Sequence, residues 1–82
     1  MSGKTISNIL GWYGAIALLL GFGLISFHFL DANNPWYQLL NLTGGAGIVI
    51  VSLSRKAYPP AFLNTIWSVI ALIALIRLFF LT

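Results

Sequence analysis

Residues 31–37 read Asp-Ala-Asn-Asn-Pro-Trp-Tyr, and residues 55–60 read Arg-Lys-Ala-Tyr-Pro-Pro. These two segments interrupt a chain that is otherwise almost continuously apolar. Asn and Asp favour turns and helix caps, and proline is tolerated in a helix only within its first turn. The segments therefore predict three apolar spans, over residues 7–30, 36–54 and 60–81. Each has roughly the 20 residues that a helix needs to cross a bilayer.

The composition indicates a membrane protein. Of the 82 residues, 60% are hydrophobic and only 6% are charged, too few to cover a small soluble domain with a polar surface. Lipid tolerates an apolar exterior but requires every backbone group to be hydrogen-bonded within the protein, which a helix achieves. We therefore expect an all-α, integral membrane three-helix bundle that forms a single membrane domain over residues 1–82.

The charged residues predict an orientation. Three helices joined by short loops run up, down and up, which places Lys4, Arg55 and Lys56 on one side and Asp31 and Arg77 on the other. Cytoplasmic loops carry an excess of Lys and Arg, so we expect the N-terminus in the cytoplasm and the C-terminus on the opposite side. Asp31 and Arg77 are a candidate ion pair, although an arginine near a helix end also reaches the interface by itself.

Several chemistries lack candidate residues. Without cysteine there are no thiolate metal sites, and one acid with one histidine leaves no catalytic set, so we expect neither an enzyme nor a metal site. The dispersed cations form no nucleic-acid surface. We expect no cofactor, and the alternative is a pigment bound through His28.

Small and polar residues recur at helical spacing in all three spans. Small residues let helices approach closely, and amides bridge helices in lipid, so the first interpretation is helix packing. The second is a polar pocket or solute pathway, since an amide in lipid needs a partner. Packing candidates are Gly11, Gly14, Ala17, Gly21, Gly44, Gly45 and Gly47, and pathway candidates are Gln38, Asn41, Asn64, Trp67 and Ser68.

The chain from Trp36 to Arg77 resembles the three-helix unit of SemiSWEET sugar transporters and the wider PQ-loop superfamily. In that unit a loop is followed by a proline and, five residues later, an asparagine; here these are Pro59 and Asn64. The sequence is most similar to small, uncharacterised bacterial three-span proteins with Asn-x-x-Gly and Asn-x-x-Trp segments, which here begin at Asn41 and Asn64. The resemblance implies a half-transporter whose two copies pair around a central path lined by Asn64, in the bacterial inner membrane.

Two functions follow from these observations. The first is a homodimer, associated through its small-residue faces, that transports or binds a small neutral solute. The second is an accessory subunit that packs against a larger membrane complex, since such subunits have short loops, glycine faces and few charges.

Overall fold

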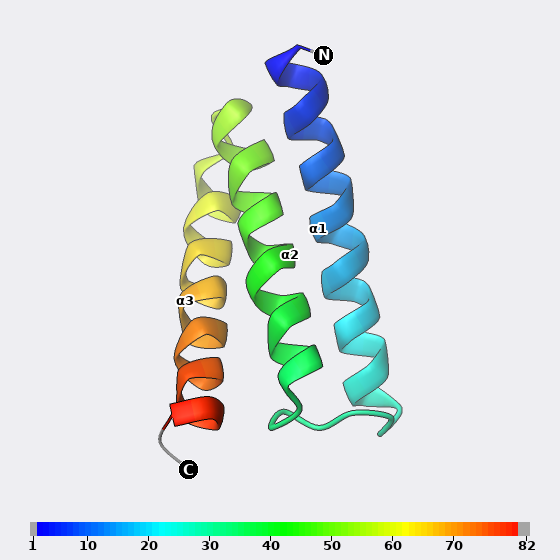
Figure 1. Ribbon diagram of the computed structural model, residues 1–82. Helices are drawn as coiled ribbons and strands as arrows, with labels where there is room; N and C mark the ends of the chain where they lie inside the picture. Colours follow the sequence, from blue (N-terminus) through cyan, green and yellow to red (C-terminus); the bar gives the residue numbers. More distant parts are fainter. Residues whose placement is uncertain (1, 81–82) are drawn as a thin grey trace.

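The computed structural model describes residues 2–80, which form three α-helices running alternately in opposite directions (Figure 1). They are α1 (Gly3–Ser26), α2 (Pro35–Ser54) and α3 (Tyr58–Phe80). With 24, 20 and 23 residues, each is long and apolar enough to cross a membrane, which confirms the expected all-helical class. The last residue of the expected third span, residue 81, lies outside the described residues.

The distribution of side chains is that of a protein in lipid. The buried hydrophobic residues are mostly alanines, such as Ala17 and Ala71, and the buried polar ones include Asn41 and Asn64. Large side chains lie on the outside instead, for example Trp12 at 71% exposure. In water such a surface would be strongly unfavourable, whereas lipid solvates it.

The α1 helix lies closer to the N-terminus than the expected span over residues 7–30. It begins at Gly3 because the Ser2 hydroxyl accepts a hydrogen bond from the Thr5 amide at 3.2 Å, which caps the first turn. It ends at Ser26, four residues before the loop segment that begins at Asp31, because the backbone turns sharply at His28. Polarity therefore located the loop but not the end of the helix.

Both α1 and α2 end in a Schellman motif whose C′ residue is not glycine. His28 has φ 65° and Lys56 has φ 56°, in the left-handed region that glycine usually occupies at this position. After α1, the Phe29 amide donates to the Leu24 carbonyl at 2.9 Å; after α2, the Ala57 amide donates to the Ser52 carbonyl at 2.8 Å. These bonds satisfy carbonyl groups that the helix ends would otherwise leave free.

The prolines lie in first turns, as their missing amide hydrogens require. Pro35 opens α2 after Asn34, whose side-chain oxygen accepts from the Trp36 amide at 2.9 Å. The α3 helix begins at Tyr58, two residues before the start expected at residue 60, so Pro59 and Pro60 occupy its first turn.

The α2 helix is the centre of the arrangement. It packs against both α1 and α3, whereas no Cα atom of α1 lies within 8 Å of α3 in the part of the chain that the structure describes (Figure 1). The loop after α1 and the end of α3 lie at one end of the molecule, opposite the N-terminus and the turn between α2 and α3. The charged residues are thereby divided between two ends, as the sequence predicts.

Glycines bring α1 and α2 together. A Cβ atom added at Gly14 would collide with the Gly44 carbonyl oxygen and lie 2.9 Å from the Ile48 amide nitrogen, and one added at Gly47 would collide with the Leu10 carbonyl. At Gly11 it would lie 2.6 Å from Val51. The helices are therefore in backbone contact, which larger residues would prevent.

Candidate functional site

The two packing faces of α2 lie about 100° apart, because consecutive residues of an α-helix are separated by that angle. Gly44 contacts Ala17 and Gly14 of α1, whereas its neighbour Gly45 contacts Ser68 and the Asn64 carbonyl of α3. The three helices consequently enclose a groove, with α2 as its floor and α1 and α3 as its walls. We call this the α1–α3 groove.

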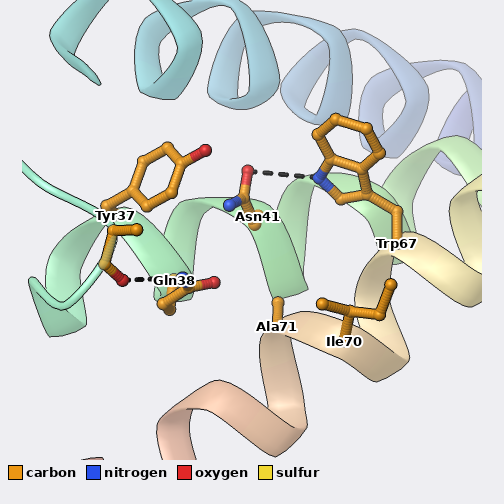
Figure 2. Close-up of a pocket in the computed structure, with 7 residues that line it drawn as sticks. Tyr37, Gln38, Asn41, Trp67, Ile70 and Ala71 are labelled. Atoms are coloured by element: carbon orange, nitrogen blue, oxygen red, sulfur yellow. Dashed lines mark hydrogen bonds between the residues drawn. The ribbon is translucent and has the colours of Figure 1, made fainter.

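The groove contains two adjoining cavities. One, of about 260 Å³, lies near the loop after α1 (Figure 2). The other, of about 370 Å³, extends along the groove between apolar walls from α1 and α3. The first is lined by Ala32, Tyr37, Gln38, Asn41, Trp67, Ile70 and Ala71, and the second by Leu18, Leu19, Phe22, Tyr37, Asn41, Leu63, Asn64 and Trp67.

A hydrogen bond between α2 and α3 joins the two cavities. The Trp67 indole Nε1 donates to Asn41 Oδ1 at 3.2 Å, and the indole lies across the groove beside the Asn41 amide (Figure 2). Asn41 is only 6% exposed, whereas Trp67 is 45% exposed and lines both cavities. The bond thus fixes the orientation of a large aromatic surface next to a buried amide.

Two amide atoms in the groove remain available to a ligand. Asn41 Nδ2 and Asn64 Oδ1 make no hydrogen bond to other residues of the segment 2–80. In the same segment no fully buried side-chain nitrogen or oxygen lacks a partner, so these two atoms keep access to the groove. One is a donor and the other an acceptor, the complement needed by a hydroxyl group or an amide.

The other pathway candidates are occupied by contacts within the chain. Gln38 Nε2 donates to the Ala32 carbonyl at 2.8 Å and holds the loop, although its side chain also lines the smaller cavity. Ser68 Oγ donates to the Leu42 carbonyl at 3.2 Å and joins α3 to α2. Asn64 Nδ2 donates to the Pro60 carbonyl, one turn earlier in its own helix, at 3.0 Å.

The small-residue faces also lie within the chain rather than on its outside. Gly11, Gly14, Ala17 and Gly21 are buried on α1, facing α2, and Gly44, Gly45 and Gly47 are buried on α2. The expectation that two copies associate through these faces is therefore wrong in its location, because one chain already covers them. A second copy has to use another surface.

The Asp31 carboxylate does not bind Arg77 in this structure. Its Oδ1 atom accepts a hydrogen bond from the Asn33 backbone amide at 2.9 Å, which forms a local turn. No ion pair joins Asp31 to Arg77. The two residues nevertheless lie at the same end, since Arg77 lines a small cavity beside Ala32 and Asn33. Both residues are exposed, and an exposed ion pair contributes little to stability, which is consistent with this separation.

Tyr37 is a site residue that the sequence did not identify. It lines both cavities, whereas its neighbour Trp36 is 73% exposed. The signal was present in the spacing: Tyr37 precedes Asn41 by four residues and so shares its face of α2.

The chemistry of the groove is neutral. No charged side chain lines either cavity, and residues 2–80 contain no group of three or more His, Cys, Asp or Glu that could hold a metal ion. The lining residues offer hydrogen bonding and aromatic stacking to a ligand.

Three apolar helices that expose large side chains and bury small ones define a helical protein suited to a membrane. A family model matches residues 7–82, nearly the whole chain, and the protein belongs to that uncharacterised family. No curated protein and no solved structure matches the chain.

Proposed function

We propose that the chain is one half of a homodimeric, SemiSWEET-like membrane transporter that binds a small neutral solute in the α1–α3 groove. The observation that supports this proposal is the Asn41–Trp67 hydrogen bond, which orients an aromatic face beside two available amide atoms. Polyhydroxylated solutes stack their apolar faces on aromatic rings and exchange hydrogen bonds with amides. The absence of charges from the groove lining favours an uncharged solute.

Dimerisation is proposed through the open side of the groove. The walls of the larger cavity present Leu18, Leu19, Phe22 and Leu63, which together with α2 form a concave apolar surface. A second copy placed over this surface would convert two grooves into one central path between the chains. The spacing of Pro59 and Asn64, which is similar to that of SemiSWEET units, supports the same arrangement.

Solute flux tests the proposal directly. Purified protein in proteoliposomes is assayed for uptake of radiolabelled mono- and disaccharides, with Asn41→Leu as the groove variant. Thr65→Val is the matched control, because Thr65 lies on α3 beside Asn64 but lines neither cavity. We expect uptake by the wild type and the control and its loss in Asn41→Leu; equal uptake by all three, or by none, contradicts transport of these solutes through the groove.

A second candidate function is an accessory subunit of a larger membrane complex. It is favoured by the same concave surface, since a cavity of about 370 Å³ with mostly apolar walls also fits apolar side chains from a helix of a foreign subunit. Native mass spectrometry of protein extracted in mild detergent separates the two functions. Twice the mass of one chain supports the dimer, and a mass that includes a different polypeptide supports the accessory subunit.

The proposed location is the bacterial inner membrane, with the N-terminus in the cytoplasm. Because the chain has no cysteine, single introduced cysteines report topology without background labelling. Ser2→Cys and Asn33→Cys lie at opposite ends of α1, and a membrane-impermeant thiol reagent applied to spheroplasts should label only the second. Labelling of the first alone would reverse the proposed orientation.

A further inference from the structure

We propose that the furrow between the N-terminal half of α1 and the C-terminal end of α2 binds one anionic phospholipid, independently of the groove and its solute. This furrow is separate from the α1–α3 groove, because it shares no lining residue with either cavity of the groove. Its lining changes from cationic at the end of the molecule to apolar further inward. The cationic part, of about 330 Å³, is lined by Lys4, Asn8, Ser54 and Arg55. The adjoining apolar part, of about 210 Å³, is lined by Asn8, Gly11, Trp12, Ala15, Val51 and Arg55.

The sequence spacing explains why the two parts form one furrow. Lys4, Asn8, Trp12 and Ala15 are separated by three or four residues and therefore lie along one face of α1. Asn8 and Arg55 line both parts, which makes the furrow continuous from the end of the helices toward the interior of the span. This is the layout of a phospholipid, whose charged headgroup lies at the interface and whose acyl chain points inward.

Hydrogen bonding arranges the cationic part for an anion. Arg55 Nη2 donates to Asn8 Oδ1 at 2.6 Å, which holds the guanidinium over the furrow. Since the Asn8 oxygen faces Arg55, the Asn8 Nδ2 group is left as a donor. The remaining Arg55 N–H groups and the Lys4 ammonium make no hydrogen bond to residues 2–80, and the Ser54 hydroxyl already donates to the Val51 carbonyl at 2.7 Å. The free groups of the furrow are therefore donors, the set that a phosphate requires.

Among residues 2–80, the charges of this end have no counterion. Lys4, Arg55 and Lys56 lie at this end, and the single acidic residue, Asp31, lies at the other end. Basic pockets between transmembrane helices at the membrane surface characteristically hold anionic headgroups. Trp12, at 71% exposure, flanks the apolar part and supplies a rigid wall for an acyl chain.

Native mass spectrometry with defined lipids tests the proposal. Purified, delipidated protein is titrated with phosphatidylglycerol or with phosphatidylcholine, which differ in headgroup charge but carry the same acyl chains. We expect one phosphatidylglycerol molecule to bind in preference to phosphatidylcholine. Arg55→Gln should weaken the affinity for phosphatidylglycerol about fivefold. Lys4→Gln should weaken the affinity to a similar extent. Because Lys4 lies outside the α1–α2 contact, loss of binding in this variant would not be due to misfolding of that contact.

Two further variants identify the site and the source of the phosphate. Arg77→Gln removes the same charge at the opposite end and should leave binding unchanged. Ala15→Phe fills the apolar part without changing any charge, so it should weaken binding of the phospholipid. Inorganic phosphate added to the wild-type complex should not displace the lipid. The proposal would be overturned if the two lipids bound equally well, or if Arg55→Gln and Arg77→Gln lost affinity for phosphatidylglycerol to the same extent. It would also be overturned if phosphate displaced the lipid and Ala15→Phe had no effect on lipid binding.

Discussion

Replacing Gly14 by alanine should separate α1 from α2, whereas the same replacement at Gly21 should not. Both glycines are buried on the face of α1 that packs against α2. A Cβ atom at Gly14 would collide with the Gly44 carbonyl oxygen and lie 2.9 Å from the Ile48 amide nitrogen, so it would meet backbone in two places. A Cβ atom at Gly21 would lie 3.6 Å from the Tyr37 ring, an ordinary van der Waals contact.

The magnitude follows from the difference between these two environments. Overpacking a well-packed contact costs about 1–3 kcal/mol, and it is costly here because backbone atoms cannot rotate away as a flexible side chain does. Alanine also gains about 1 kcal/mol of helix propensity over glycine, but this gain applies equally to both positions. The difference in the free energy of unfolding between Gly14→Ala and Gly21→Ala therefore isolates packing, and we expect about 1–3 kcal/mol.

The assay is reversible unfolding in mixed micelles by titration with a denaturing detergent, followed by tryptophan fluorescence. Gly23→Ala is the second control, because a Cβ atom there would have no neighbour within 4 Å. The two controls should be neutral or slightly more stable than the wild type. Equal stability of Gly14→Ala and Gly21→Ala would refute the backbone contact between α1 and α2, and with it the position of α2 between the other helices.

Three other experiments test a hydrogen bond, a helix end and a possible ion pair by the same unfolding assay. Trp67→Phe removes the donor to Asn41, and a double-mutant cycle with Asn41→Ala should give a coupling of about 0.6 kcal/mol; a value of zero would mean that the bond does not form. His28→Gly removes the cost of the left-handed backbone conformation after α1 and should stabilise the protein by about 1 kcal/mol. If the same variant instead lost a visible absorption band, His28 would be assigned to a pigment. Asp31→Asn keeps the turn to Asn33 and should change stability by less than about 0.5 kcal/mol; a larger loss would indicate an ion pair with Arg77.

The number and type of the helices could be predicted because they depend on length and composition alone. Apolar runs of sufficient length, separated by Asn-Pro and Pro-Pro, leave few alternatives in a chain with so few charges. The end of α1 could not be predicted in this way. Residues 27–30 contain no glycine, proline or asparagine to indicate that the helix stops at Ser26, because His28 adopts the left-handed conformation without being glycine.

The site was predicted in part, for a related reason. Helical spacing correctly grouped Gln38 and Asn41 on one face of α2, and the structure adds Trp67 as the partner of Asn41. The periodicity of one helix, however, does not say which neighbour its face meets. Ser68 was therefore a pathway candidate by spacing, although its hydroxyl donates to a backbone carbonyl of α2.

The central position of α2 has a cause that can be read from its glycines. Gly44 and Gly47 approach α1, while Gly45, offset by about 100°, approaches α3, so α2 offers two close-packing faces. The buried residues of α1 and of α3 each form a single stripe, such as Gly11 to Gly21 on α1. A helix with one such stripe packs closely against one neighbour, and only a helix with two can pack against both. The groove between α1 and α3, and any site within it, therefore follows from the adjacent glycines at positions 44 and 45.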